Sequence, residues 1–230
     1  MSLFALGDTH LSLGTDKPMD SFSGWNNYVS RLEKNWRALV KDEDTVVIAG
    51  DISWAMTLEE SLEDFRFLDS LPGEKILIKG NHDYWWETKT KMDKFFADNG
   101  IKSIRILFNN AYEVGDFCVC GTRGWFFDDE SDSQQKLISR EEGRLNLSID
   151  EAEKTGKEPI VFLHYPPLTR ANKCDEICDT LVRRGIKRCF YAHLHGVTHT
   201  LAFQGNLDGV EYSLISGDYL KFCPKLIEKI

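Results

Sequence analysis

The chain has 230 residues, enough for one large domain or two small ones with a substantial buried core. Its composition, 42% hydrophobic and 28% charged, is that of a globular protein and excludes a disordered or fibrous one. The formal net charge of −9 disfavours a broad nucleic-acid interface, which needs a basic face. No apolar run approaches the length of a membrane span, and the first residues lack the basic segment of a signal peptide. We therefore expect a cytoplasmic protein without membrane contact.

The first half of the chain alternates apolar runs with amphipathic segments. The apolar runs predict β-strands at residues 2–6, 45–49 and 75–79. Apolar side chains that recur every three and four positions predict helices from about Trp25 to Leu39, from about Leu58 to Leu68, and from about Glu87 to Asn99. A repeated strand, helix, strand pattern is typical of a largely parallel sheet.

The second half mixes shorter strands with helices. Strands are expected at residues 104–108, 111–114, 117–121, 160–163 and 189–192, and helices at about 132–155 and 175–184. The tight turn Gly115–Asp116 indicates antiparallel hairpins in the middle of the chain, and residues 197–204 and 210–216 predict a last hairpin. No linker or repeat divides the chain, and the candidate site residues come from both of its ends. We therefore expect a single domain over residues 1–230.

Polar side chains that bind metal ions or move protons follow five of these strands. They lie in the segments GDTH (residues 7–10), GDIS (50–53), GNHD (80–83), His164, and HLH (193–195). Five of the six histidines stand at these strand ends, and His199 is the exception. In open α/β sheets ligands bind outside the carboxyl ends of the strands, so the five segments are expected to meet at one site.

Each of these residues also has an ordinary structural explanation. Asp8 could cap a helix, Asn81 could belong to a turn, and His164 could be a hydrogen-bonded core histidine. Five such segments in order, each after a predicted strand, favour an active-site rim instead. Trp85 and Trp86 fit core packing better than a substrate platform. The six cysteines lack the repeated spacing of a structural zinc site, which favours inert thiols.

The ordered set of these five segments resembles the calcineurin-like metallophosphoesterase superfamily, and the resemblance spans nearly the whole chain. It implies an α/β fold with two mixed β-sheets packed as a sandwich and helices on the outer faces. It also implies that the chain hydrolyses a phosphoester with two divalent metal ions. Mixed oxygen and nitrogen ligands suit Mn, Fe or Zn better than Ca or Mg.

The resemblance assigns a role to each site residue. It gives one metal ion to Asp8, His10 and His195, the other to Asn81, His164 and His193, and both to Asp51. A shared carboxylate lets two cations lie close together despite their repulsion. His82 resembles the family's proton donor to the leaving group, and Asp83 resembles the carboxylate that orients it.

Some residues depart from the family pattern. Ala192 stands before the HLH segment where the family usually has glycine, and we expect the ligands to tolerate this change. Phosphoprotein-phosphatase relatives continue the second motif with Asp and Arg, where this chain has Trp54 and Ala55, and they have Arg where it has Lys79. Arg123, between two glycines, is either a substrate contact or part of a turn with a surface salt bridge.

We therefore expect a dinuclear-metal-dependent hydrolase, and specifically a phosphodiesterase acting on a small or nucleotide-like phosphoester. Three alternatives are a phosphomonoesterase of the same fold, a non-catalytic metal-binding scaffold, and a nuclease that acts on DNA ends. A scaffold would have lost ligands, whereas all seven are present. A nuclease needs a basic groove, which the net charge disfavours.

Overall fold

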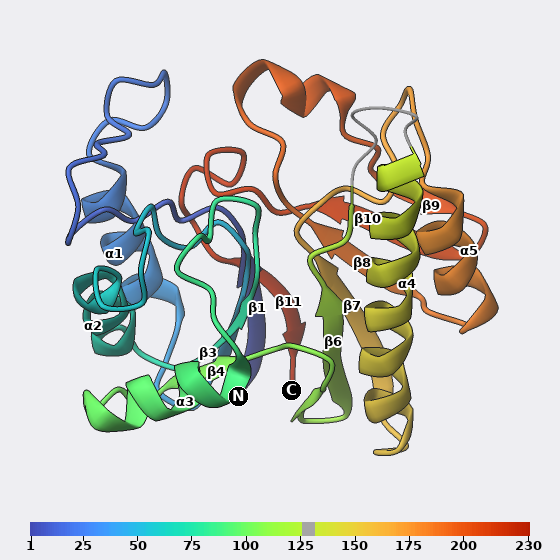
Figure 1. The fold of residues 1–230 in the computed structure, drawn as a ribbon, viewed down its shortest axis with the longest axis horizontal. Helices are drawn as coiled ribbons and strands as arrows, with labels where there is room; N and C mark the ends of the chain where they lie inside the picture. Colours follow the sequence, from blue (N-terminus) through green and yellow to red (C-terminus); the bar gives the residue numbers. More distant parts are fainter. Residues whose placement is uncertain (126–131) are drawn as a thin grey trace.

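The computed structural model describes residues 1–125 and 132–230, which form two β-sheets packed face to face between two layers of helices. Figure 1 shows α1, α2 and α3 on the outer side of one sheet and α4 and α5 on the outer side of the other. No helix in these two ranges is long and apolar enough to cross a bilayer.

The first sheet has the strand order β11-β1-β2-β3-β4. Its strands are β1 (Ser2–Leu6), β2 (Thr45–Ala49), β3 (Glu74–Ile78), β4 (Ile104–Ile106) and β11 (Lys225–Lys229). Four of them are parallel, as the alternating pattern predicts, and β11 pairs antiparallel with β1. The helices that follow its strands are α1 (Tyr28–Leu39), α2 (Leu62–Ser70) and α3 (Lys89–Asp98).

The second sheet has the order β5-β6-β7-β8-β10-β9. Its strands are β5 (Tyr112–Val114), β6 (Phe117–Thr122), β7 (Glu158–Leu163), β8 (Arg188–Tyr191), β9 (Gly205–Leu207) and β10 (Val210–Leu214). The four central strands are parallel and the two edge strands are antiparallel. Its helices are α4 (Asp132–Glu153), α5 (Asp175–Arg183) and the 3₁₀ helix η1 (Gly196–Leu201).

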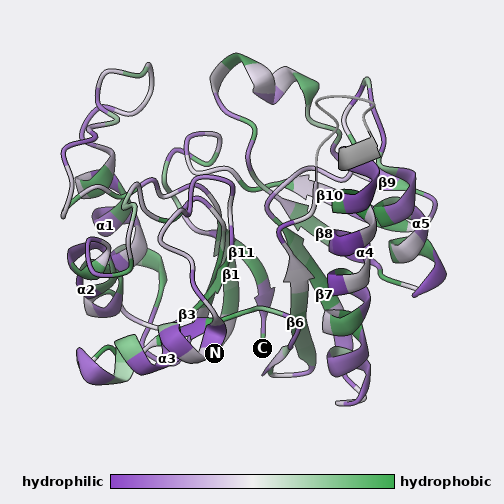
Figure 2. Cartoon of the chain, in the orientation of Figure 1, coloured by the Kyte–Doolittle hydropathy of each residue, from purple (hydrophilic) through white to green (hydrophobic). Residues whose placement is uncertain are grey.

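Apolar side chains fill the three spaces between the four layers. In α1, Tyr28, Leu32 and Trp36 are buried against the first sheet, because a spacing of four residues places them on one face of the helix. The space between the sheets is filled by alternate residues of the strands, such as Val47 and Phe162. The strands are accordingly mostly hydrophobic, whereas the helices carry many hydrophilic residues (Figure 2).

The ends of the parallel strands of both sheets meet at one edge of the sandwich. The backbone N–H of Gly7, just after β1, donates to the carbonyl oxygen of Ile215, just after β10 (2.7 Å). The ring of His164, just after β7, donates to the carbonyl oxygen of Ala49 at the end of β2 (3.0 Å). The segments predicted to form a site are thus brought together from both sheets.

Three sequence predictions need correction. Residues 104–106 form no hairpin with β5 but pair parallel with β3, because the chain crosses to the second sheet after β4. Residues 197–204 are not a strand, since residues 196–201 turn as η1 and the hairpin is the shorter pair β9 and β10. The edge strand β11 was not expected, because its two adjacent apolar residues are flanked by lysines and a glutamate and do not form an apolar run.

Candidate metal centre

Two groups of three candidate ligands lie next to each other at this edge. Asp8, His10 and His195 each offer a ligand atom within 4.8 Å of the other two, and so do Asp51, His164 and His193. The first group is the set that the sequence analysis assigned to one metal ion, and the second combines His164 and His193 of the other set with the shared residue Asp51. Two ligand atoms that bind one ion at roughly 2.0–2.2 Å lie at most roughly 4.4 Å from each other, so small side-chain movements would bring each group onto one ion.

Asp51 lies between the two groups. Its Oδ2 atom is 3.6 Å from Nε2 of His10 in the first group and 3.6 Å from Nε2 of His164 in the second. Its other oxygen, Oδ1, accepts a hydrogen bond from the backbone N–H of His82 (2.7 Å), which fixes the carboxylate. This is the geometry of a carboxylate that two ions share.

Asn81 completes the second group. Its Oδ1 atom lies 2.7 Å from Nε2 of His164 and 3.0 Å from Nδ1 of His193. Because Nδ1 of His164 donates to the Ala49 carbonyl, its Nε2 presents a lone pair to the amide oxygen. Two lone pairs that face each other are satisfied by a cation between them, so these residues fit a metal ion.

The pKa shifts of the buried carboxylates and histidines also fit a site for two cations. Burial, followed by the negative charge of Asp8, raises the pKa of Asp51 to about 8. Burial lowers the pKa of His10 and of His193 to about 3, which keeps both imidazoles neutral, the form that binds metal. For His195, the carboxylates of Asp8 and Asp218 outweigh burial and raise the pKa to about 10. Divalent cations would relieve the repulsion between the buried carboxylates.

The backbone at the site is strained. Asp8, His10, Asp51 and His193 have positive φ angles of 57°, 41°, 50° and 73°. Side chains other than glycine rarely adopt this left-handed region, and such strain clusters at functional sites. These four residues lie in the tight turns that follow the strands.

Two glycines of the motifs are required by close packing. A Cβ atom on Gly50 would lie 2.5 Å from Nδ1 of His164. A Cβ atom on Gly7 would collide with the Cβ of Ala192. Ala192, where the family usually has glycine, is therefore accommodated because its neighbour Gly7 has no side chain.

His82 lies beside the candidate ligands and outside both groups. Its ring packs against Trp54, with centroids 4.4 Å apart, and its Nδ1 atom is buried with no hydrogen-bond partner among the described residues. Burial, and then the nearby His164 and His195, lower the pKa of His82.

The role expected for Asp83 needs correction. Its two oxygens accept hydrogen bonds from the backbone N–H groups of Gly80 (2.7 Å) and Ile52 (2.8 Å) and from the indole of Trp85 (2.9 Å). None of these donors is the ring of His82. Asp83 instead ties the GDIS and GNHD loops together, because a buried carboxylate binds N–H groups of both. Trp85 is 1% exposed and is therefore a core residue, which is the interpretation that the sequence analysis favoured.

Arg123 contributes its backbone to the site and directs its side chain elsewhere. Its carbonyl oxygen accepts from the backbone N–H of Tyr165 (2.8 Å), next to the candidate ligand His164. Its guanidinium lies 3.9 Å from the buried Glu141 of α4 and 4.9 Å from the ring centre of Trp125.

Asp218 was missed by the sequence analysis. Its Oδ1 atom accepts from Nδ1 of His195 (2.9 Å) and Nε2 of His199 (3.2 Å), and its Oδ2 atom accepts from the backbone N–H of Gly196 (2.9 Å). The bond to Nδ1 leaves Nε2 of His195 directed at Asp8, 3.6 Å away. The signal was present, since Gly217–Asp218 follows an apolar run in the same way as Gly7–Asp8 and Gly50–Asp51.

Comparisons with known proteins identify the family and the fold. The family model described as calcineurin-like phosphoesterase matches residues 1–197. Two solved structures share the fold over 98% of this chain and 95% of their own. One is a protein of unknown function from Aquifex aeolicus (TM-score 0.51, 16% identity), and the other is the phosphopantetheinyl hydrolase of Mycobacterium tuberculosis (0.52, 14%).

A curated relative, an uncharacterized protein of Methanocaldococcus jannaschii, is 28% identical over 90 residues. The match covers 37% of this chain and 48% of that protein, so it spans about half the length of the relative.

Proposed function

The chain belongs to the calcineurin-like phosphoesterase family and is a metal-dependent phosphohydrolase, and on this premise we propose that it is a single-domain phosphodiesterase for small or nucleotide-like phosphoesters. We assign one divalent ion to Asp8, His10 and His195 and the other to Asn81, His164 and His193. The observation that carries the assignment is the position of Asp51 Oδ2, 3.6 Å from a histidine nitrogen of each group.

Mn, Fe or Zn ions held at these residues would neutralise the phosphate and activate the attacking water. The residues of the chain supply the rest. The buried carboxylates of Asp51 and Asp8 supply the negative charge of the centre. Asp218 accepts a hydrogen bond from Nδ1 of His195 and keeps its ring in place. His82 lies at the side of the centre with its ring against Trp54, where it is free to act as an acid.

His82 protonates the leaving group. In the proposed step, the oxygen of water forms a bond to phosphorus in line with the ester bond that breaks. The attacking water gives up a proton to the solvent, and the departing oxygen takes the ester electron pair and a proton from the His82 ring, which is then reprotonated from the solvent. A phosphomonoester and an alcohol are released. A histidine donor matters most when the leaving alcohol is a poor leaving group.

We expect a preference for diesters because positively charged side chains are missing beside the proposed metal ligands. A monoester dianion has one more negative oxygen than a diester, and arginines beside the metals would bind it. Ala55 is buried and uncharged, and in the described residues the side chain of neither Lys79 nor Arg123 forms a hydrogen bond or ion pair with a proposed ligand. The ion pair of Arg123 with Glu141 supports its alternative role as a turn residue rather than a substrate contact.

The test is kinetic. We compare kcat/KM for bis(4-nitrophenyl) phosphate and 4-nitrophenyl phosphate with Mn present. Each missing charged hydrogen bond is worth about 1.5–3 kcal/mol, so the wild type should prefer the diester about tenfold to a hundredfold. Arg123→Ala should keep this preference, and so should the control Arg144→Ala, which removes the other arginine on Glu141.

The opposite pattern would overturn the diesterase proposal. If the wild type strongly prefers the monoester, and Arg123→Ala but not Arg144→Ala loses that preference, then Arg123 binds the dianion and the enzyme is a monoesterase.

A further inference from the structure

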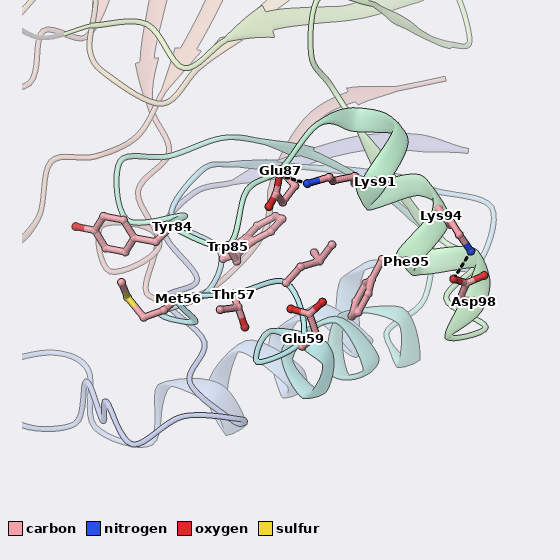
Figure 3. A pocket seen from close by; sticks show the side chains of 11 residues that line it. Met56, Thr57, Glu59, Tyr84, Trp85, Glu87, Lys91, Lys94, Phe95 and Asp98 are labelled. Atoms are coloured by element: carbon pink, nitrogen blue, oxygen red, sulfur yellow. Dashed lines mark hydrogen bonds and ion pairs between the residues drawn. The ribbon is translucent and has the colours of Figure 1, made fainter.

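A hollow of about 440 Å³ lies between the loop after β2 and helix α3. Figure 3 shows Tyr84 and Met56 at one end of it, Trp85 and Phe95 along it, and Lys94 with Asp98 at the other end. Pockets for small organic molecules have volumes of about 300–1,000 Å³. The hollow can therefore hold a group the size of one or two rings.

Ring contacts connect the hollow to the proposed metal centre. The ring of Tyr84 lies 6.1 Å from the ring of His82, edge to face, and Met56 follows two residues after Trp54, whose indole packs on His82. Since His82 is assigned to the leaving oxygen, the group attached to that oxygen extends past His82. Tyr84, at one end of the hollow, is a lining residue whose ring contacts His82.

The buried residues beneath the hollow are apolar, and the charged residues of its lining are exposed. Trp85 and Leu58 are buried beneath the hollow and Phe95 is half-buried. The two lysines already have partners on or next to their own helix, Lys91 with Glu87 (3.2 Å) and Lys94 with Asp98 (2.7 Å).

Glu59 adds a negative charge at the rim. Its carboxylate is exposed and forms no hydrogen bond or ion pair with the described residues. An anionic group in the hollow would therefore meet an uncompensated carboxylate, whereas a hydroxyl or amine would find an acceptor.

We propose that this hollow is the leaving-group subsite, which binds a neutral or cationic aryl alcohol while the phosphate lies at the metal centre. The inference rests on the proposed function, because it uses His82 as the proton donor. It defines the substrate class by the alcohol that leaves. In an unsymmetrical diester, it determines which of the two ester groups lies in the hollow and is released.

The test uses two diesters with a common methyl group, methyl phenyl phosphate and methyl hexafluoroisopropyl phosphate. Their leaving alcohols have similar acidity, and only phenol is a flat ring. Glu59→Trp fills the hollow from its exposed rim. The matched control is Thr90→Trp, at an exposed position of α3 that does not line the hollow. The measurement is kcat/KM for both diesters with Mn present, together with the metal content of each protein.

Burial of a phenyl ring changes binding by roughly 10- to 100-fold. We expect the ratio of kcat/KM for the phenyl diester to that for the fluoroalkyl diester to fall at least about tenfold in Glu59→Trp and to stay within about twofold of wild type in Thr90→Trp. A wild type that hydrolyses both diesters, with the same ratio in Glu59→Trp, would overturn the subsite and leave the proposed function standing. A metal-loaded wild type that hydrolyses neither diester would overturn the proposed function itself.

A second variant tests the charge of the subsite. In the wild type, a 4-carboxyphenyl leaving group should be hydrolysed more slowly than phenyl, and Glu59→Gln should reduce this difference several-fold at low ionic strength. An unchanged difference in Glu59→Gln would show that Glu59 does not face the leaving group.

Discussion

Asp218→Ala should weaken metal binding at one of the two sites and spare the other. In the structure Asp218 holds Nδ1 of His195 at 2.9 Å and is itself 6% exposed, so no water molecule can easily take its place. A hydrogen bond to a charged group contributes about 1.5–3 kcal/mol. The expected loss is therefore about 10- to 100-fold in affinity for the ion held by Asp8, His10 and His195, the range typical of such supporting residues.

The assay is a competition between the protein and a chelating dye for Mn, at one fixed pH, which resolves two dissociation constants. Asp218→Asn should lose less than Asp218→Ala, because an amide oxygen can still accept from His195. His199→Ala is the matched control, since it removes another partner of Asp218 and leaves the bond to His195 in place. Equal weakening of both sites by Asp218→Ala, or weakening of neither, would refute the reasoning.

Two further predictions concern catalysis and pH. His82→Ala should keep both metal ions and lose about 10²- to 10⁴-fold in kcat on alkyl diesters but much less on nitrophenyl diesters. Steady-state kinetics and metal analysis check this prediction, and equal losses on both kinds of diester would contradict it. The metal-free protein should lose stability between pH 6.5 and about 8, because folded Asp51 and His195, with raised pKa values, retain protons that the unfolded chain releases. At about 1.4 kcal/mol per pH unit Asp51 alone contributes about 2 kcal/mol. The lowered pKa values of His10 and His193 act in the opposite direction only below pH 6.5. Urea unfolding at the two pH values checks this prediction, and a free energy of unfolding that rises over the interval would contradict it.

The parallel strands and their polar ends could be predicted because both signals are local. An apolar run of five residues followed by Gly–Asp or Gly–Asn is visible in the sequence, and β1, β2 and β3 lie within one residue of the predicted positions. The sorting of the ligands into two groups came from the resemblance to a family. The positions of Asp51 and Asn81 agree with that sorting.

The contacts that could not be predicted depend on the other sheet or on a distant helix. The direction of Arg123 is set by Glu141, a buried residue of α4 eighteen positions away. One partner of Asp83, the backbone N–H of Ile52, comes from a loop thirty-one residues earlier in the chain. A strand was predicted for residues 197–204, but residues 196–201 form a 3₁₀ helix, held by the bonds of Asp218 to His195 and to the N–H of Gly196.

The number of metal ions bound by the wild type and by Asp51→Asn tests the central claim most directly. After reconstitution with Mn and removal of free metal, the wild type should hold two ions per chain. Asp51→Asn should hold at most one under the same conditions, because Asp51 Oδ2 lies between both groups. A wild type that binds no metal, or an Asp51→Asn variant that binds two ions with wild-type affinity, would contradict the account.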